Sequence, residues 1–170
     1  MNSEFKTLYF TMVKKMWDIE DQLVRQLPKM AAQATSKELH DTLLAHQKET
    51  EEQRTRIGNI LDANDEPEAG TANPSFEQML REAEEEMVAI TDPNVRDAYI
   101  IAAARSVEHL EMSKYMTLLD FAKAMEDSDA EEVFREILNE EEKADKKLAA
   151  VATGGFMGLM AEGVNEKAIA

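Results

Sequence analysis

The chain contains 170 residues with a formal net charge of −16, no cysteine, and only four prolines and six glycines. Disulfides, thiolate metal sites and cysteine nucleophiles are therefore excluded, and the acidic charge argues against nucleic acid or an anionic membrane as a partner. The scarcity of proline and glycine, together with abundant Ala, Leu, Met, Glu and Lys, predicts an all-α protein. No stretch resembles a signal peptide or is apolar enough to span a bilayer, so we expect a cytoplasmic location.

The first part of the chain predicts two long helices, at about 3–32 and 37–63. Apolar residues recur along each at the spacing of a helix that buries one face. Polar side chains interrupt both of these faces. Glu20 lies on the apolar face of the first helix, His46 lies on that of the second, and Glu49 follows one turn after His46.

The rest of the chain predicts a long crossover and two more long helices. The crossover, 64–92, begins with a loop rich in proline and glycine and contains a short amphipathic helix at 76–90. The third and fourth long helices are predicted at about 93–125 and 128–152. A partly apolar tail, 153–170, is expected to fold back on the other helices.

Helix-capping residues and connection lengths predict the topology. Asp92 followed by Pro93 favours the start of the third long helix, and Ser128 followed by Glu131 has the capping-box pattern for the fourth. Short connections make an antiparallel hairpin of the first two long helices and another of the last two. We therefore predict a single ferritin-like domain, an all-α four-helix bundle whose one long crossover contains an extra short helix.

The third and fourth long helices also carry carboxylates among apolar residues. Counting from the turn of each hairpin at about 1.5 Å per residue places the inward polar residues of both hairpins near the middle of the bundle. Burying unpaired carboxylates is costly, so such a cluster needs a partner. Seven residues are candidate metal ligands at this level: Glu20, His46, Glu49, Glu108, Glu111, Glu141 and Asp145.

Each of these residues alone has an ordinary explanation. A single inward glutamate can reflect a misassigned helix phase or a paired charge, and a single core histidine is usually only hydrogen-bonded. The agreement in depth on four helices favours a metal site instead. An oxygen-rich ligand set with one nitrogen suits iron or manganese, and six carboxylates would be neutralised by two ferric ions and nearly neutralised by two ferrous ions. Tyr115 and Gln53 are expected to orient ligands or to be ordinary core polar groups, and a radical-bearing Tyr115 is a less favoured alternative.

At these residues the sequence resembles the YciE/YciF family of ferritin-like proteins. The matching segments are WDIEDQLVRQLPKMA, HQKET, DPNVRDAYIIAAARSVEHLEMSKY and LNEEEKADKKL, so the likeness covers all four long helices. The resemblance implies a ferritin-like bundle with a di-iron type centre, a homodimer, and a bacterial protein associated with stress responses. The chain departs from the common Glu-x-x-His pattern of di-iron bundles, because His46 precedes Glu49 and no histidine follows Glu141. Fewer imidazoles make the centre more anionic, which should favour oxidised metals.

Two functional hypotheses follow. The first is a protein holding two iron ions, or manganese in their place, that carries out redox chemistry on dioxygen or peroxide in bacterial stress protection. As an enzyme it would be a di-iron oxidoreductase such as a ferroxidase or a peroxidase. The alternative is a non-catalytic, metal-stabilised helical dimer with a structural or interaction role. We expect a homodimer because exposed apolar area is predicted on the short helix, 76–90, or near Trp17.

Overall fold

The computed structural model describes residues 2–68 and 71–153, which form five α-helices and no strand. The all-α prediction is confirmed. The four long helices pair into two hairpins, and a shorter helix lies in the crossover, beginning two residues before its predicted start. The helices are α1 (Ser3–Gln33), α2 (Lys37–Ala63), α3 (Pro74–Ala89), α4 (Pro93–Met125) and α5 (Ser128–Val151).

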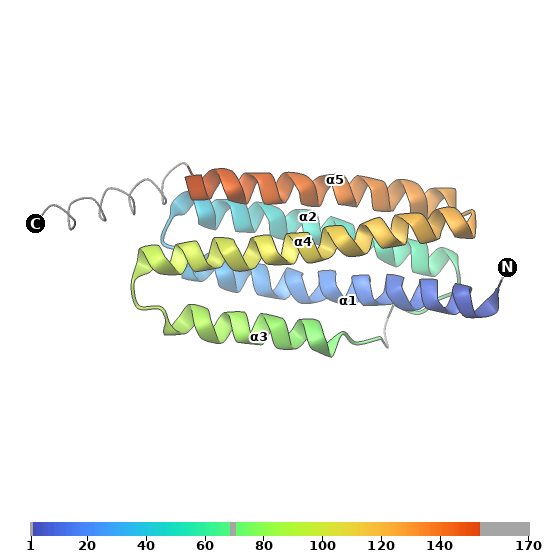
Figure 1. Ribbon diagram of the computed structural model, residues 1–170, viewed down its shortest axis with the longest axis horizontal. Helices are drawn as coiled ribbons and strands as arrows, with labels where there is room; N and C mark the ends of the chain where they lie inside the picture. Colours follow the sequence, from blue (N-terminus) through green and yellow to red (C-terminus); the bar gives the residue numbers. More distant parts are fainter. Residues whose placement is uncertain (1, 69–70, 154–170) are drawn as a thin grey trace, which may run out of the picture.

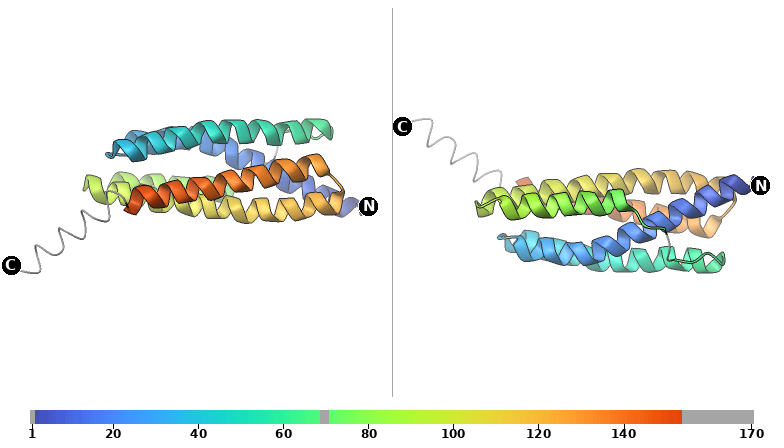
Figure 2. Two further views of the ribbon diagram at one scale, coloured as in Figure 1. Left: turned by 90° about the horizontal axis from the view of Figure 1, so that it is seen from above. Right: turned by 90° about the horizontal axis from the view of Figure 1, so that it is seen from below.

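The four long helices surround one core in the order α1, α2, α5, α4, and each runs antiparallel to its neighbours (Figures 1 and 2). The turn of the α1–α2 hairpin and the turn of the α4–α5 hairpin lie at opposite ends of the bundle (Figure 1). The crossover therefore has to carry the chain back along the bundle. Helix α3 does this on the outside, against α1 and α4. The predicted ferritin-like arrangement with one long crossover is confirmed.

Capping side chains define where the helices begin. The predicted cap Asp92 is present, and Asn2 and Ser36 cap α1 and α2 in the same way. The side chain of each accepts a hydrogen bond from a backbone N–H group of the first turn. The cap predicted for α5 is wrong by one residue. Asp127, not Ser128, accepts from the backbone N–H of Ala130, at 3.0 Å. Glu126 ends α4 in the left-handed conformation, with φ of 58°. The carboxylate of the next residue, Asp127, lies at the N-terminus of α5, where the helix dipole favours a negative charge.

Large apolar side chains fill the space between the long helices. Their burial is the main favourable contribution to folding, and the buried residues follow the predicted helical spacing. The largest fully buried side chains include Tyr9, Phe10, Met16, Ile19, Leu23, Leu39, Leu43, Ile57, Tyr115 and Phe134. No helix in the described part of the chain is long and apolar enough to cross a membrane. The predicted folding back of the tail concerns residues 154–170, which lie outside the described residues.

A buried carboxylate joins the two hairpins at one end of the bundle. Asp97, in the first turns of α4, is 3% exposed. It accepts hydrogen bonds from the backbone N–H groups of Thr35, at 2.8 Å, and Ser36, at 2.7 Å. These N–H groups lie at the start of α2, where the helix dipole favours a negative charge. The α1–α2 turn is thereby fixed to the beginning of α4.

Candidate metal centre

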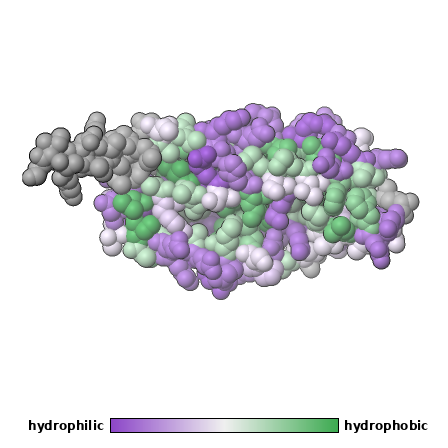
Figure 3. All heavy atoms as spheres, in the orientation of Figure 1, coloured by the Kyte–Doolittle hydropathy of each residue, from purple (hydrophilic) through white to green (hydrophobic). Residues whose placement is uncertain are grey.

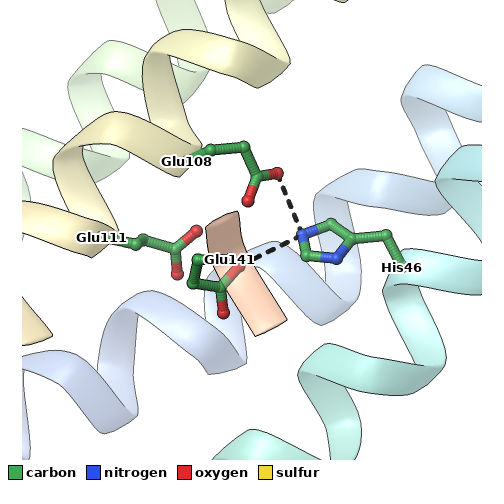
Figure 4. Close-up of side chains that lie close together, drawn as sticks. All are labelled: His46, Glu108, Glu111 and Glu141. Carbon is green, nitrogen blue, oxygen red and sulfur yellow. Dashed lines mark ion pairs between the residues drawn. The ribbon is translucent and has the colours of Figure 1, made fainter. Parts of the chain in front are cut away.

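Four buried side chains from three helices converge near the middle of the bundle. His46 comes from α2, Glu108 and Glu111 come from α4, and Glu141 comes from α5. One ligand atom from each lies within 4.8 Å of those of the others. Figure 4 shows all four side chains pointing toward one another. His46 is 7% exposed and the three glutamates are at most 1% exposed, so the cluster is shielded from bulk water.

The spacing of these residues in the sequence brings them together. Glu108 and Glu111 are three positions apart and project from the same face of α4. His46 and Glu141 project from α2 and α5, which pack against each other. The Nε2 atom of His46 lies 3.1 Å from Oε1 of Glu108 and 4.0 Å from Oε2 of Glu141. Imidazole and carboxylate ligand atoms therefore meet within the reach of one cation.

A fifth predicted residue, Glu20 of α1, borders this cluster. Glu20 is fully buried, and the charges of Glu108 and Glu111 act on it. Its Oε1 atom accepts a hydrogen bond from the hydroxyl of Tyr115, which is also fully buried. The cluster of Glu20, His46, Glu108, Glu111 and Glu141 is called the central site below. All four long helices contribute to it.

Most carboxylate oxygens of the central site have no hydrogen-bond partner in the described structure. These are Oε2 of Glu20, Oε2 of Glu108, and both oxygens of Glu111 and of Glu141, six of the eight oxygens of the four glutamates. Buried polar atoms are normally hydrogen-bonded, and an unpaired buried carboxylate is strongly unfavourable. Six such oxygens facing one imidazole are an arrangement that bound cations would stabilise. The donor set therefore fits a metal centre.

Burial changes the acid–base properties of the central site. It raises the pKa of Glu20 to about 7, although the Tyr115 hydroxyl and His46 oppose the rise. Burial and the neighbouring carboxylates raise the pKa values of Glu111 and Glu141 well above the ordinary glutamate value. Burial alone would lower the pKa of His46, but the adjacent carboxylates, chiefly Glu108, raise it well above the ordinary value. Without metal, the site thus favours bound protons.

Two predicted ligands lie outside the central site. Asp145 is not brought into it, because both of its oxygens accept hydrogen bonds from Arg105, at 2.7 and 3.3 Å. This guanidinium holds the pKa of Asp145 below its ordinary value. Glu49 lies at the margin, with its side chain 39% exposed between the imidazole of His46 and the ammonium group of Lys147. Six carboxylates were predicted as ligands, and four of them lie in the central site.

The two predicted supporting residues have different roles. Tyr115 contacts a glutamate of the central site directly, as expected. Gln53 is fully buried, but its amide donates to Glu140, at 3.1 Å, in a group of charges that also contains Arg56. Sequence reasoning did not single out Arg105, although it lies one turn before Glu108 on α4 and so could reach a carboxylate of α5.

Comparisons with known proteins agree with this fold. A family model described as a domain of unknown function, DUF892, matches residues 4–168. The protein YciF of Escherichia coli K12 is 30% identical over 146 residues, which cover 85% of this chain and 88% of YciF. The crystal structure of the E. coli stress protein YciF superimposes with a TM-score of 0.83 at 29% identity, covering 89% of this chain and 96% of YciF. YcfI of Rhodopseudomonas palustris, to which a structural role has been provisionally assigned, has a TM-score of 0.82 at 32% identity, covering 85% of this chain and 92% of that protein.

Proposed function

The chain belongs to the DUF892 family, as a YciF-like member, and we propose that it is a di-metal protein that carries out redox chemistry on dioxygen or peroxide. The observation that carries this proposal is the set of six buried carboxylate oxygens without partners around the imidazole of His46. A single inward carboxylate could be tolerated by holding a proton. Four buried carboxylates close together, drawn from three helices, are better explained by bound cations.

Charge and ligand type favour two iron ions, with manganese as the alternative. The four glutamates of the central site carry four negative charges when ionised, and two divalent cations carry four positive charges. Oxygen-rich ligand sets with one imidazole suit iron and manganese better than soft metals. A di-metal centre built from inward glutamates is also the design of ferritin-like bundles, an analogy at the level of the fold.

The chain's own residues would hold and shield the metal centre. His46, Glu108, Glu111, Glu141 and Glu20 supply the ligand atoms, and Tyr115 fixes the position of Glu20 through its hydroxyl. The surrounding apolar core excludes bulk water. When bound, iron would supply the electrons that reduce dioxygen or peroxide, passing from the ferrous to the ferric state. Removal of peroxide, or of ferrous iron, would suit a stress protein, and YciF of E. coli is described as one.

The direct test measures metal and oxygen together. Protein produced with added iron is analysed for iron per chain, and its reduced form is mixed with dioxygen or peroxide while the oxidant is followed. We expect about two irons per chain and consumption of one of the oxidants. The variant Glu111→Gln should lose metal, whereas Glu132→Gln, the same change at an exposed position of α5, should not. A folded parent protein without bound iron would refute the proposal.

A second candidate function is a metal-stabilised structural protein without turnover. The observation that favours it is the enclosure of the central site: its residues are buried, and the cavity next to His46 has a volume of only about 10 Å³. A space of that size holds about one water molecule. The structural role provisionally assigned to YcfI points the same way. Full iron content with no consumption of either oxidant would favour this second function.

We also propose that the protein is a homodimer. Leu8 on α1 and Met116 on α4 are 48% and 51% exposed, and Val88 on α3 is 64% exposed. The face formed by these three helices carries hydrophobic residues, in green, among the hydrophilic ones, in purple (Figure 3). A second copy could cover this exposed apolar area, and in a symmetric dimer both copies use the same surface. Sedimentation at micromolar concentration should give the mass of two chains, and the mass of one chain would refute this proposal.

A further inference from the structure

A small opening between α2 and α5 lies beside His46, the one residue of the central site that lines it. Its cavity, of about 10 Å³, adjoins both His46, which belongs to the site, and two charged residues of the surface. The residues that line it are Thr42, Leu43, His46, Glu49, Ala144, Lys147 and Leu148.

The imidazole of His46 lies between the carboxylates of the central site and the charged residues at the surface. Its Nε2 atom faces inward, 3.1 Å from Oε1 of Glu108. Its Nδ1 atom faces outward, 3.7 Å from Oε2 of Glu49. The side chain is only 8% exposed, and this Nδ1 atom is buried without a hydrogen-bond partner in the described structure. An unpaired buried nitrogen thus points toward a carboxylate at the surface.

An ion pair covers the opening. The Nζ atom of Lys147, on α5, lies 3.3 Å from Oε1 of Glu49, on α2. The two side chains are 53% and 39% exposed, so solvent surrounds both and the pair is held weakly. A lysine on a flexible stem can leave such a pair without rearrangement of the backbone.

We propose that this opening is the route by which divalent cations reach the central site, with Glu49 as the first carboxylate that a cation meets. Lys147 competes with the cation for Glu49 and has to move away before the cation passes to His46. This inference rests on the proposed metal centre and assigns a function to the two residues that cover it. Glu49 is then a residue of the uptake route, not a permanent ligand.

The charges on the neighbouring side of α5 favour this route over one beside Asp145. There the guanidinium of Arg105 holds Asp145 through two hydrogen bonds, and His109 lies 3.5 Å from the same carboxylate. A planar guanidinium bound at two points is harder to displace than a single ammonium group. A cation approaching from that side would meet a fixed positive charge.

The test compares rates of metal uptake in matched variants. Metal-free protein is mixed with Co²⁺ alone, without oxygen, and its visible absorption is followed by stopped flow. The variant Lys147→Met should take up Co²⁺ roughly two- to fivefold faster than the parent, a range set by the weakness of exposed ion pairs. The control Lys146→Met removes the same charge from the next residue, which pairs with Glu142 at 3.7 Å and is 75% exposed. Its rate should equal that of the parent.

Two further measurements make the result decisive. Glu49→Gln should slow uptake several-fold while the final amount of Co²⁺ per chain stays unchanged, and added salt should reduce the difference between Lys147→Met and the parent. Equal rates for Lys147→Met and Lys146→Met would overturn the route. A lower final amount in Glu49→Gln would also overturn it, because Glu49 would then be a ligand. A folded parent that binds no Co²⁺ would refute the metal centre itself.

Discussion

Raising the pH should destabilise the metal-free protein. The glutamates of the central site have raised pKa values in the folded state, so the folded chain holds protons that the unfolded chain releases. The free energy of unfolding therefore falls as pH rises from the ordinary glutamate range through the folded pKa values. His46 acts with the same sign, because its raised pKa gives stability below the ordinary histidine value that is lost as pH rises.

The size of this effect can be worked out for Glu20. Its pKa rises from 4.5 to about 7, and each pKa unit corresponds to about 1.4 kcal/mol, so full deprotonation removes roughly 3 kcal/mol. Between about pH 6 and about pH 7.5, Glu20 alone accounts for about 1 kcal/mol. Glu111 and Glu141, whose pKa values are also raised, add to the decline.

The assay is urea unfolding of chelated protein at these two pH values and one protein concentration, followed by helical circular dichroism. Glu20→Gln should have a smaller decline than the parent by about 1 kcal/mol, since one titrating group is removed. The exposed control Glu132→Gln should decline as the parent does. Bound metal replaces the protons, so the loaded protein should lose most of the decline. Equal stability of the chelated parent at both pH values would mean that the glutamates do not share a water-excluded site.

Three other substitutions test individual contacts. Glu111→Ala should greatly lower the bound metal while helical circular dichroism stays nearly intact, and full metal content would remove Glu111 from the ligand set. Tyr115→Phe should weaken metal binding by about 10- to 100-fold, measured by competition with a chelator, because Glu20 loses the hydroxyl that holds it. Asp145→Asn should leave the metal content unchanged, since Arg105 already occupies that carboxylate, and a clear loss of metal would return Asp145 to the ligands.

Helical periodicity and connection lengths were sufficient to predict the bundle. Each long helix has an apolar face that a few polar side chains interrupt. Counting residues from the two turns placed Glu20, His46, Glu108, Glu111 and Glu141 at one depth, where the structure has them. Depth along a helix is fixed by its regular rise, so it can be counted from the sequence.

The direction in which a side chain points around the helix axis is less well fixed by the sequence. This direction explains why the two other predicted ligands, Asp145 and Glu49, lie outside the central site. Asp145 follows Glu141 by four positions, which places it on nearly the same face, but nearer the edge where Arg105 reaches it. Glu49 is likewise at the edge of α2, where Lys147 of α5 is available. Which positively charged side chain pairs with a carboxylate at the edge of a helix depends on the neighbouring helix, and the sequence alone does not give that pairing.

The carboxylate of Asp97 helps to align the two hairpins that form the central site. It fixes the start of α4 to the start of α2, and Glu108 lies eleven residues further along α4, roughly 16 Å away. If one hairpin slid along the other by a single helical turn, His46 and Glu108 would separate by about 5 Å and no cation could bridge them. Asp97 thus contributes to the longitudinal alignment of the two hairpins, and a substitution there would act on the central site from a position far from every ligand.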